Sequence, residues 1–447
     1  SHGHAIAANG LTSWRLQYAC PNIRGEAYTV YTNTPVAGAM RGYGIPQVCF
    51  AIECFMDDAA NAIHMDPLEF RRKNLIRGYY EDIYLKPIAA NSNGIFECLK
   101  KGADYIHWDE KRKKYASQSG TIRRGVGMAL FSYKTGVWPI SLEISGARLS
   151  LNQDGSVQVI LGATEIGQGA DTVFSQMVAE TLQTDMEHVH IMSTQDTDIS
   201  PFDTGAYASR QTFVTGTAVR HCAEILRDKI LVYVKKLLPD IDTTELELRD
   251  NWIWAGGERA ISLSALAEES YYSLTNSSVL TAEVSEQVKR NTIATGCCFA
   301  EVEVDIKLGK IKILHIINVH DSGKLINPQL AEMQVQGGMS MGMGYGISEQ
   351  LILDEKTGRP LNGNLLDYKM MTMLDTPEIK VDFVELNDPI GPYGNKALGE
   401  PPAIPCAPAI RNAVLNATGI AFNENPLTPQ KLIDGFRKHG LIAADSR

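Results

Sequence analysis

The sequence lacks the features of a membrane protein, a secreted protein or a general nucleic-acid binder. No stretch approaches the roughly 18 consecutive apolar residues that span a bilayer, and the first residues show neither the charged start nor the apolar core of a signal peptide. The 52 acidic residues outnumber the 42 basic ones, which leaves a formal charge of −10 and disfavours nucleic acids and anionic membranes as partners. We therefore expect a cytoplasmic protein that binds neither.

Metal-binding and nucleotide-binding patterns are also missing. Eight cysteines occur and none has the Cys-x-x-Cys spacing, so we expect small core residues in a reducing compartment rather than disulfides, zinc or an iron–sulfur cluster. The adjacent Cys297 and Cys298 would point to opposite faces of a strand. No Gly-x-Gly-x-x-Gly fingerprint or Walker lysine sits at a strand-to-helix turn, so a generic nucleotide-binding module is the least favoured function.

The patterns that are present predict a mixed α+β protein. A chain of 447 residues should form two or three domains, and no internal repeat is visible. Pro46 opens one predicted helix, and a cap at Asp66 followed by Pro67 opens a second that ends near Gly78. Three- and four-residue spacing predicts the buried face of the first helix, formed by Val48, Ile52, Phe55, Met56, Ala59 and Ile63.

Alternation and turn residues predict the other elements. Two hairpins pair residues 146–151 with 157–161 and residues 299–306 with 311–319. The basic run 111–114 is expected to be a solvated face. Further strands are predicted at residues 21–33, 365–373 and 379–385, and further helices after the loops 167–169 and 203–210, at 334–346 and at 407–416.

Glycine-rich loops mark candidate anion sites. Gly167-Gln168-Gly169 lies where a strand ends and a helix begins, a place where free backbone N–H groups and the helix dipole stabilise an anion. Residues 203–210 precede another helix and predict a second such cradle. The glycines of residues 334–346 would each cost about 1 kcal/mol in a helix. Close backbone approach to a neighbouring helix or to a ligand must offset that cost.

Glu400 is the strongest candidate for a catalytic base. It follows Gly399 and precedes Pro401 and Pro402, which fix φ and remove backbone donors, so its carboxylate can be aimed but hardly moved. A general base needs such placement, although a lone Gly-Glu-Pro-Pro is more often a surface turn. Three other loops favour the interpretation of Glu400 as a base. These polar or glycine-rich loops lie upstream and are predicted to converge on one large anionic cofactor: residues 40–46, 162–169 and 334–338.

The order of these motifs resembles the molybdenum-binding subunit of the xanthine dehydrogenase and aldehyde oxidase family, and most of all its bacterial xanthine-oxidising members. The resemblance runs through nearly the whole chain and depends on the ordered set rather than on any one motif. The motifs are Pro21-Asn-Ile-Arg-Gly25, Arg71-Arg-Lys-Asn-Leu75, Gly167-Gln-Gly169, Ala300-Glu-Val-Glu-Val304, His320-Asp321, Ile326-Asn-Pro328, Leu366-Asp-Tyr-Lys369 and Gly399-Glu-Pro-Pro402.

The resemblance implies a fold, a cofactor and a set of site residues. It implies molybdopterin-binding domains of the xanthine oxidase type that hold a molybdenum pterin, either plain or as its cytosine dinucleotide. The family hydroxylates electron-poor carbon with water, and Glu400 matches its base. Arg41 matches an arginine beside the molybdenum that is not a side-chain ligand, and Tyr43 an aromatic residue beside the substrate. The other implied cofactor-binding positions are Gly167, Gln168, Gly169, Ala208, Ser209 and Gln334.

Two departures from the family pattern affect the expected substrate and partners. A second substrate-stacking aromatic should fall within residues 133–138, where Gly136 or one of its neighbours stands instead of phenylalanine. The chain starts without Met and lacks the family's N-terminal half. We therefore expect residues 1–115 to be the remainder of the first molybdopterin-binding domain with a helical connector, and residues 116–447 to be the second. The expected partners are the missing half, iron–sulfur and FAD subunits and, in a homo-oligomer, further copies of this chain.

The sequence thus predicts an oxidoreductase of the xanthine dehydrogenase type whose substrate is a purine, hypoxanthine or xanthine. Two alternatives stay open. One is an aldehyde or another N-heterocycle as substrate. The other is a non-catalytic, cofactor-free fragment whose glycine loops merely pack.

Overall fold

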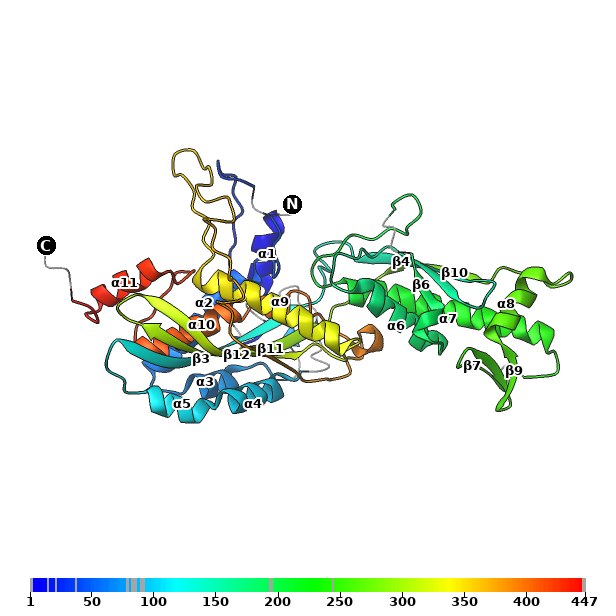
Figure 1. Ribbon diagram of the computed structural model, residues 1–447, viewed down its shortest axis with the longest axis horizontal. Helices are drawn as coiled ribbons and strands as arrows, with labels where there is room; N and C mark the ends of the chain where they lie inside the picture. Colours follow the sequence, from blue (N-terminus) through cyan, green and yellow to red (C-terminus); the bar gives the residue numbers. More distant parts are fainter. Residues whose placement is uncertain are drawn as a thin grey trace.

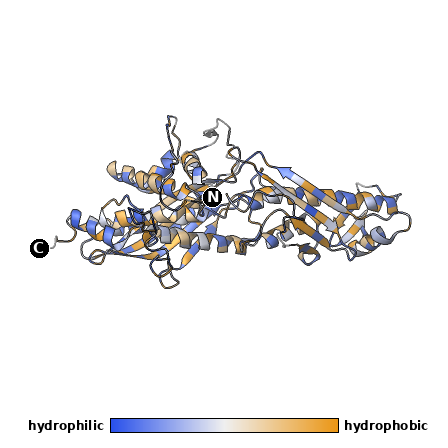
Figure 2. Ribbon diagram, turned by 90° about the horizontal axis from the view of Figure 1, so that it is seen from above, coloured by the Kyte–Doolittle hydropathy of each residue, from blue (hydrophilic) through white to orange (hydrophobic). Residues whose placement is uncertain are grey.

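The computed structural model describes residues 3–13, 16–20, 22–36, 38–77, 80–81, 87–88, 93–192, 196–242 and 245–443. Two lobes lie end to end along the long axis of the molecule (Figures 1 and 2). Both lobes contain helices and sheets, so the predicted α+β class is confirmed. The predicted division after residue 115 falls between α5 (Trp108–Tyr115) and β3 (Ile122–Lys134) and stays a prediction. Within these described ranges, no helix is long and apolar enough to cross a membrane.

The first lobe is built on a four-stranded sheet with apolar side chains on both faces. Its order is β13 (Ile379–Phe383), β12 (Lys310–Asp321), β11 (Ile293–Asp305) and β3, with β12 and β13 parallel and the other pairs antiparallel. One face packs against α9 (Pro328–Ile347) and α10 (Cys406–Thr418), and the other against α4 (Ile95–Ile106) and α5. Cys298 faces the first pair of helices and Cys297 the second, as predicted.

The second lobe has its own sheet and carries the glycine loops. The strand order is β10 (Thr281–Gln287), β4 (Ile144–Leu151), β5 (Val157–Leu161) and β6 (Val189–Ile191). Two helices, α6 (Ala170–Leu182) and α7 (Gln211–Leu237), share its hydrophobic core. The far end of the lobe (Figure 1) holds a small sheet and one helix: β7 (Leu246–Arg249), β8 (Trp252–Ala255), β9 (Glu258–Ser262) and α8 (Leu263–Tyr272).

The remaining elements belong to the first lobe (Figure 1). The Asp66 side chain accepts hydrogen bonds from the N–H groups of Leu68 and Glu69, which confirms the predicted cap of the helix α3 (Pro67–Asn74). That helix ends at Asn74, and the predicted end, Gly78, lies outside the described residues. These elements are α1 (Gly3–Ser13), α2 (Ile45–Ala62), α3 (Pro67–Asn74), α11 (Pro429–Lys438) and the paired short strands β1 (Tyr80–Glu81) and β2 (Pro87–Ile88).

The buried face of α2 differs from the predicted one. Phe55 and Ile63 are 67% and 56% exposed, whereas Glu53 and Asp57 are buried. The cause is Arg71 of α3, whose guanidinium lies 2.8 Å from Glu53 Oε2 and 2.6 Å from Asp57 Oδ1. Hydrophobic spacing assigns charged residues to the solvent side, so it does not detect a buried ion-pair cluster.

Two predicted strands are wrong. Within the described residues, 22–33 and 365–373 contain no strand, and Tyr31 and Leu374 are essentially fully exposed. The segments 22–36 and 351–375, here called the arm, rise side by side from the first lobe (Figure 1), with Gly358 packed against the backbone of Asn33. Isolated apolar alternation is not enough for a strand, because a strand needs a pairing partner and a packed face.

The predictions for the cysteines and for the basic run are each confirmed in part. All eight cysteines are free, and seven are buried as predicted for core residues, whereas Cys20 is exposed. Lys113 and Lys114 are exposed as predicted. Lys111 instead lies 2.7 Å from the buried carboxylate of Glu301. The basic run is therefore exposed to solvent at Lys113 and Lys114, whereas Lys111 forms an ion pair with Glu301 of β11.

Candidate active site

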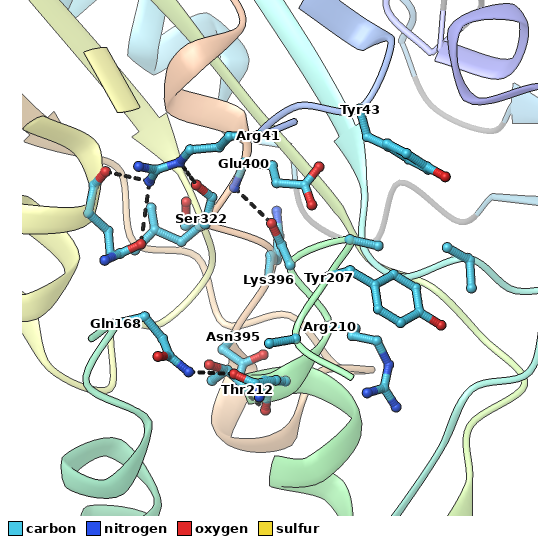
Figure 3. Close-up of a pocket in the computed structure, with 18 of the residues that line it drawn as sticks. Arg41, Tyr43, Gln168, Tyr207, Arg210, Thr212, Ser322, Asn395, Lys396 and Glu400 are labelled. Carbon is cyan, nitrogen blue, oxygen red and sulfur yellow. Dashed lines mark hydrogen bonds between the residues drawn. The ribbon is translucent and has the colours of Figure 1, made fainter. Parts of the chain in front are cut away.

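A cavity of about 640 Å³ lies where the two lobes meet (Figure 3). Three helices begin at its wall: α6 just after Gln168, α7 at Gln211 and α9 just after Asn327. The helix dipole adds positive potential at these starts. Side chains cap α6 and α9, whereas the first N–H groups of α7 have no side-chain cap. The start of α7 therefore favours an anionic group in the cavity. Seven of the predicted site residues line the cavity: Arg41, Tyr43, Gln168, Ala208, Ser209, Gln334 and Glu400.

Glu400 precedes a short 3₁₀ turn, Pro401–Ala403, against which α9 packs directly. A Cβ at Gly338 would lie 2.6 Å from the Pro402 Cβ, and one at Gly342 would lie 2.7 Å from the Ala403 carbonyl oxygen. Both distances are too short for real Cβ atoms, so larger residues would push helix and turn apart. The glycines of α9 thus allow the close backbone approach that the sequence predicts. The segment that approaches α9 is the turn that follows Glu400.

Two donors fix the carboxylate of Glu400. The Tyr133 hydroxyl donates to Oε2 at 2.6 Å, and the Gly42 N–H donates to the same oxygen at 3.2 Å. Burial raises the pKa of Glu400 above its ordinary value, against the lowering effect of these hydrogen bonds and of the Arg41 charge. A fixed carboxylate with a raised pKa has the properties of a general base.

Arg41 is held beside Glu400 by carbonyl oxygens. Its Nε donates to the Gly399 carbonyl, and its Nη2 donates to the Gln334 carbonyl at 2.7 Å and to the Gln334 side-chain oxygen at 3.3 Å. Burial lowers the pKa of Arg41, whereas the charge of Glu400 raises it. Within the described residues the guanidinium makes no ion pair within 4.0 Å. Arg41 thus places a positive charge at the cavity wall beside Glu400.

The glycine loop before α6 presents Gln168 to the cavity but does not present free N–H groups. The carboxylate of Glu165 accepts the N–H groups of Gly167 at 2.6 Å, Gly169 at 3.2 Å and Asp171 at 3.1 Å. The prediction that these N–H groups are free is therefore wrong, because the Glu165 side chain of the same loop accepts hydrogen bonds from them. Both glycines have positive φ, 95° and 87°, a backbone conformation that favours glycine and turns the loop around Gln168.

The Gln168 amide is anchored on three sides. Its Nε2 donates to the Thr164 carbonyl at 2.9 Å and to the Gln211 side chain at 2.6 Å, and its Oε1 accepts the Ile166 N–H at 2.7 Å. One acceptor position of Oε1 is left, because an amide oxygen has two lone pairs.

The second predicted anion-binding loop, residues 203–210, ends in a paired cation. Arg210 forms ion pairs with Glu143 and Asp203 inside the second lobe.

Tyr43, Ala208 and Ser209 have left-handed backbone close to Glu400. Their φ values are 47°, 51° and 49°. The Ser209 hydroxyl accepts the Glu400 N–H at 2.8 Å. The Tyr43 ring, 9% exposed, lies at the cavity near Glu400 (Figure 3). Burial raises the pKa of Tyr43, and the Glu400 charge adds to the effect.

Sequence reasoning missed Tyr133, Ser322 and Asn395. Tyr133 alternates like a core residue of β3, and the other two are small polar residues in loops. Ser322 Oγ and Asn395 Oδ1 are buried at the cavity wall without a hydrogen-bond partner among the described residues. Such atoms cost about 1–3 kcal/mol each when left unpaired, so they fit a cavity meant for a polar ligand. Together with Arg41 and the helix termini, they fit a phosphate-bearing pterin.

Comparisons with known proteins agree with this chemistry. The molybdopterin cofactor-binding domain family matches residues 101–377, and a second model with the same description matches residues 1–75. The putative xanthine dehydrogenase molybdenum-binding subunit XdhA of Escherichia coli (strain K12) is 48% identical over 99% of this chain and 59% of its own length. The probable hypoxanthine oxidase XdhD of the same strain is 30% identical over 98% of this chain and 46% of its own length. The crystal structure of aldehyde oxidoreductase from Desulfovibrio gigas matches with a TM-score of 0.80 and 25% identity, over 97% of this chain and 45% of that one.

The fold and the cavity define a protein that holds a large anionic cofactor between two lobes. The chain belongs to the molybdopterin cofactor-binding domain family. The resemblance drawn from the motifs is thereby confirmed, and so is the molybdenum pterin as its cofactor. The chain spans 59% of the length of XdhA, so the activity, substrate and partners of a whole enzyme are matters of proposal.

Proposed function

We propose that this chain is the part of a xanthine dehydrogenase-type molybdenum hydroxylase that holds the cofactor and supplies the base, and that the substrate is hypoxanthine or xanthine. One observation carries the proposal: Glu400 is a buried carboxylate of raised pKa, fixed by two donors at the wall of an anion-favouring cavity. The bound molybdenum pterin supplies the redox centre at which an electron-poor C–H is hydroxylated with water.

The side chains divide into a base and a set of cofactor contacts. Glu400 accepts a proton on its carboxylate during substrate oxidation. Arg41 places its charge beside the metal without ligating it, and Gln334 keeps the guanidinium in place. Gln168 contacts the cofactor from the turn made by its two flanking glycines. Ala208 and Ser209 contact it from the start of α7, where the helix terminus favours its phosphate.

The choice of a purine is supported by two relatives and one residue. The printed names of XdhA and XdhD refer to xanthine and hypoxanthine, and Tyr43 offers an aromatic ring beside the proposed base. An aldehyde is the second candidate, because the matching Desulfovibrio gigas structure is an aldehyde oxidoreductase. The plain pterin and its cytosine dinucleotide form are both compatible with the proposal.

We also propose that the arm contacts further polypeptide of the same enzyme. The arm exposes apolar residues, including Leu365 at 82% and Leu374 at 98%, and the relative XdhA has a segment that this chain does not span. Electrons would leave through iron–sulfur and FAD groups on partner chains or domains. The division into residues 1–115 and 116–447 is part of the same proposal.

The test separates turnover from cofactor content in the enzyme as isolated. Glu400→Gln keeps the shape and removes the basicity, so turnover should fall by roughly 10²–10⁴ while molybdenum content is kept. Glu303→Gln, at an ion pair with Arg124 on the same lobe, is the control and should change neither. Arg41→Ala and Gln168→Ala should lower molybdenum content. Near-normal turnover of Glu400→Gln would refute the base, and full molybdenum in the other two would reassign their roles.

A further inference from the structure

We infer that Tyr133 is a positioning residue that fixes the carboxylate of the proposed base Glu400 through a hydrogen bond, while Ser209 holds the backbone of the same residue. The inference depends on the proposed function, in which Glu400 accepts the proton. Tyr133 is the next-to-last residue of β3 and 2% exposed. Its ring therefore stands in the core of the first lobe, and its hydroxyl alone reaches the carboxylate.

Two hydroxyl groups hold Glu400. The Glu400 N–H donates to Ser209 Oγ at 2.8 Å. The Tyr133 hydroxyl donates to Glu400 Oε2 at 2.6 Å. The backbone and the carboxylate of Glu400 are thus each held by a different side chain.

The Tyr133 hydrogen bond restrains what the two prolines leave free. Pro401 and Pro402 restrain the backbone after Glu400, but they do not restrain its side-chain torsions. A carboxylate has about four acceptor positions, and Tyr133 and Gly42 both donate to Oε2. The remaining positions can take the proton from a group in the cavity. Tyr133 therefore sets which acceptor positions of Glu400 remain available.

The hydrogen bond from Tyr133 also favours the ionised carboxylate and lowers the pKa of Glu400 against the effect of burial. Removing the hydroxyl should raise that pKa further. A base works when it is ionised, so the acid limb of kcat/KM should move to higher pH. Below that limb kcat/KM should fall roughly ten- to hundredfold, the range that a hydrogen bond to a charged group contributes.

The test is Tyr133→Phe in the complete enzyme, with Tyr115→Phe as the matched control. Tyr115 is also buried, at 6% exposure, and also donates to a carboxylate at 2.6 Å, that of Glu301. It lies outside the cavity. Both variants lose the same kind of hydrogen bond, so they should lose similar stability. Only Tyr133→Phe should shift the pH profile, with turnover recovering at alkaline pH.

A second measurement needs no turnover. The infrared band of the protonated Glu400 carboxyl group, identified by its loss in Glu400→Gln, should titrate at higher pH in Tyr133→Phe than in the unaltered enzyme. An unchanged titration would overturn the role of Tyr133 even if Glu400 is the base. If Glu400→Gln keeps its turnover, the proposed base fails, while the infrared shift still decides whether Tyr133 controls the carboxylate. An equal shift in Tyr115→Phe would also overturn the inference.

Discussion

Left-handed backbone is concentrated in residues that hold Glu400. Ser209 has a φ of 49°, although a non-glycine residue in this region costs of order 1–3 kcal/mol. Its hydroxyl accepts the Glu400 N–H, and the N–H of Gly42, whose φ is 97°, donates to the Glu400 carboxylate. Tyr43, with a φ of 47°, follows Gly42 directly. The left-handed turns therefore serve to place hydrogen-bonding groups on both sides of one residue.

Tyr43 gives a prediction about substrate choice. Offset stacking on a flat ring contributes about 0.5–1.5 kcal/mol beyond area burial. Replacing Tyr43 by Ala should therefore lower kcat/KM for an aromatic heterocycle about two- to tenfold more than for a small aliphatic aldehyde. Tyr43→Phe keeps the ring and is the control, which should preserve the ratio. Equal losses for both substrates in Tyr43→Ala would assign Tyr43 to packing.

At the scale of elements, α9 is the part whose sequence is tied most closely to the site. Gly337 and Gly338 are neighbours on this helix with different surroundings. A Cβ at Gly337 would meet only Arg41 Nη1 at 3.5 Å, an ordinary contact, whereas one at Gly338 would lie 2.6 Å from the Pro402 Cβ. Alanine at each of the two positions therefore separates the effect of helix propensity on stability from the effect of close packing.

Gly338→Ala should destabilise the protein by about 1–3 kcal/mol, because overpacking forces the helix and the Glu400 turn apart. Gly337→Ala is the matched control and should be neutral or stabilising by up to about 1 kcal/mol, because alanine favours the helix. Chemical denaturation measures both. Similar stabilities of the two variants would contradict the packing observed here.

Elements with strong local signals were predictable from the sequence, and contacts between distant segments were not. The β4–β5 hairpin, the cap of α3 and the helix after Gly169 follow from turn residues and spacing. The buried Glu53 depends on Arg71 of another helix, and the Tyr133 contact depends on a residue 267 positions away. The motif resemblance placed seven site residues at one cavity, but it did not reveal that Glu165 caps the glycine loop.

At the scale of the molecule, the arm is the feature least explained by the chain's own packing. If it contacts further polypeptide, as proposed, replacing Leu365 and Leu366 together by Asp should lower the midpoint of thermal unfolding of the complete enzyme. Both side chains are more than three quarters exposed in this chain, and surface substitutions normally stay within about 0.5 kcal/mol. Leu308→Asp, at an exposed turn position between β11 and β12, is the control. An unchanged midpoint in the double variant would refute the contact.

The cavity joins the beginning of the chain to its end. Arg41 donates a hydrogen bond to the Gly399 carbonyl, and the Gly42 N–H donates one to the Glu400 carboxylate. The two partners are 358 positions apart in each pair. During synthesis from the N-terminus, the arginine loop emerges long before the turn that completes it. Because contacts of such separation close the longest loops, we expect the site to be among the last parts of the protein to assemble. A nascent chain that stops before residue 399 contains every strand of both sheets and still has no active site.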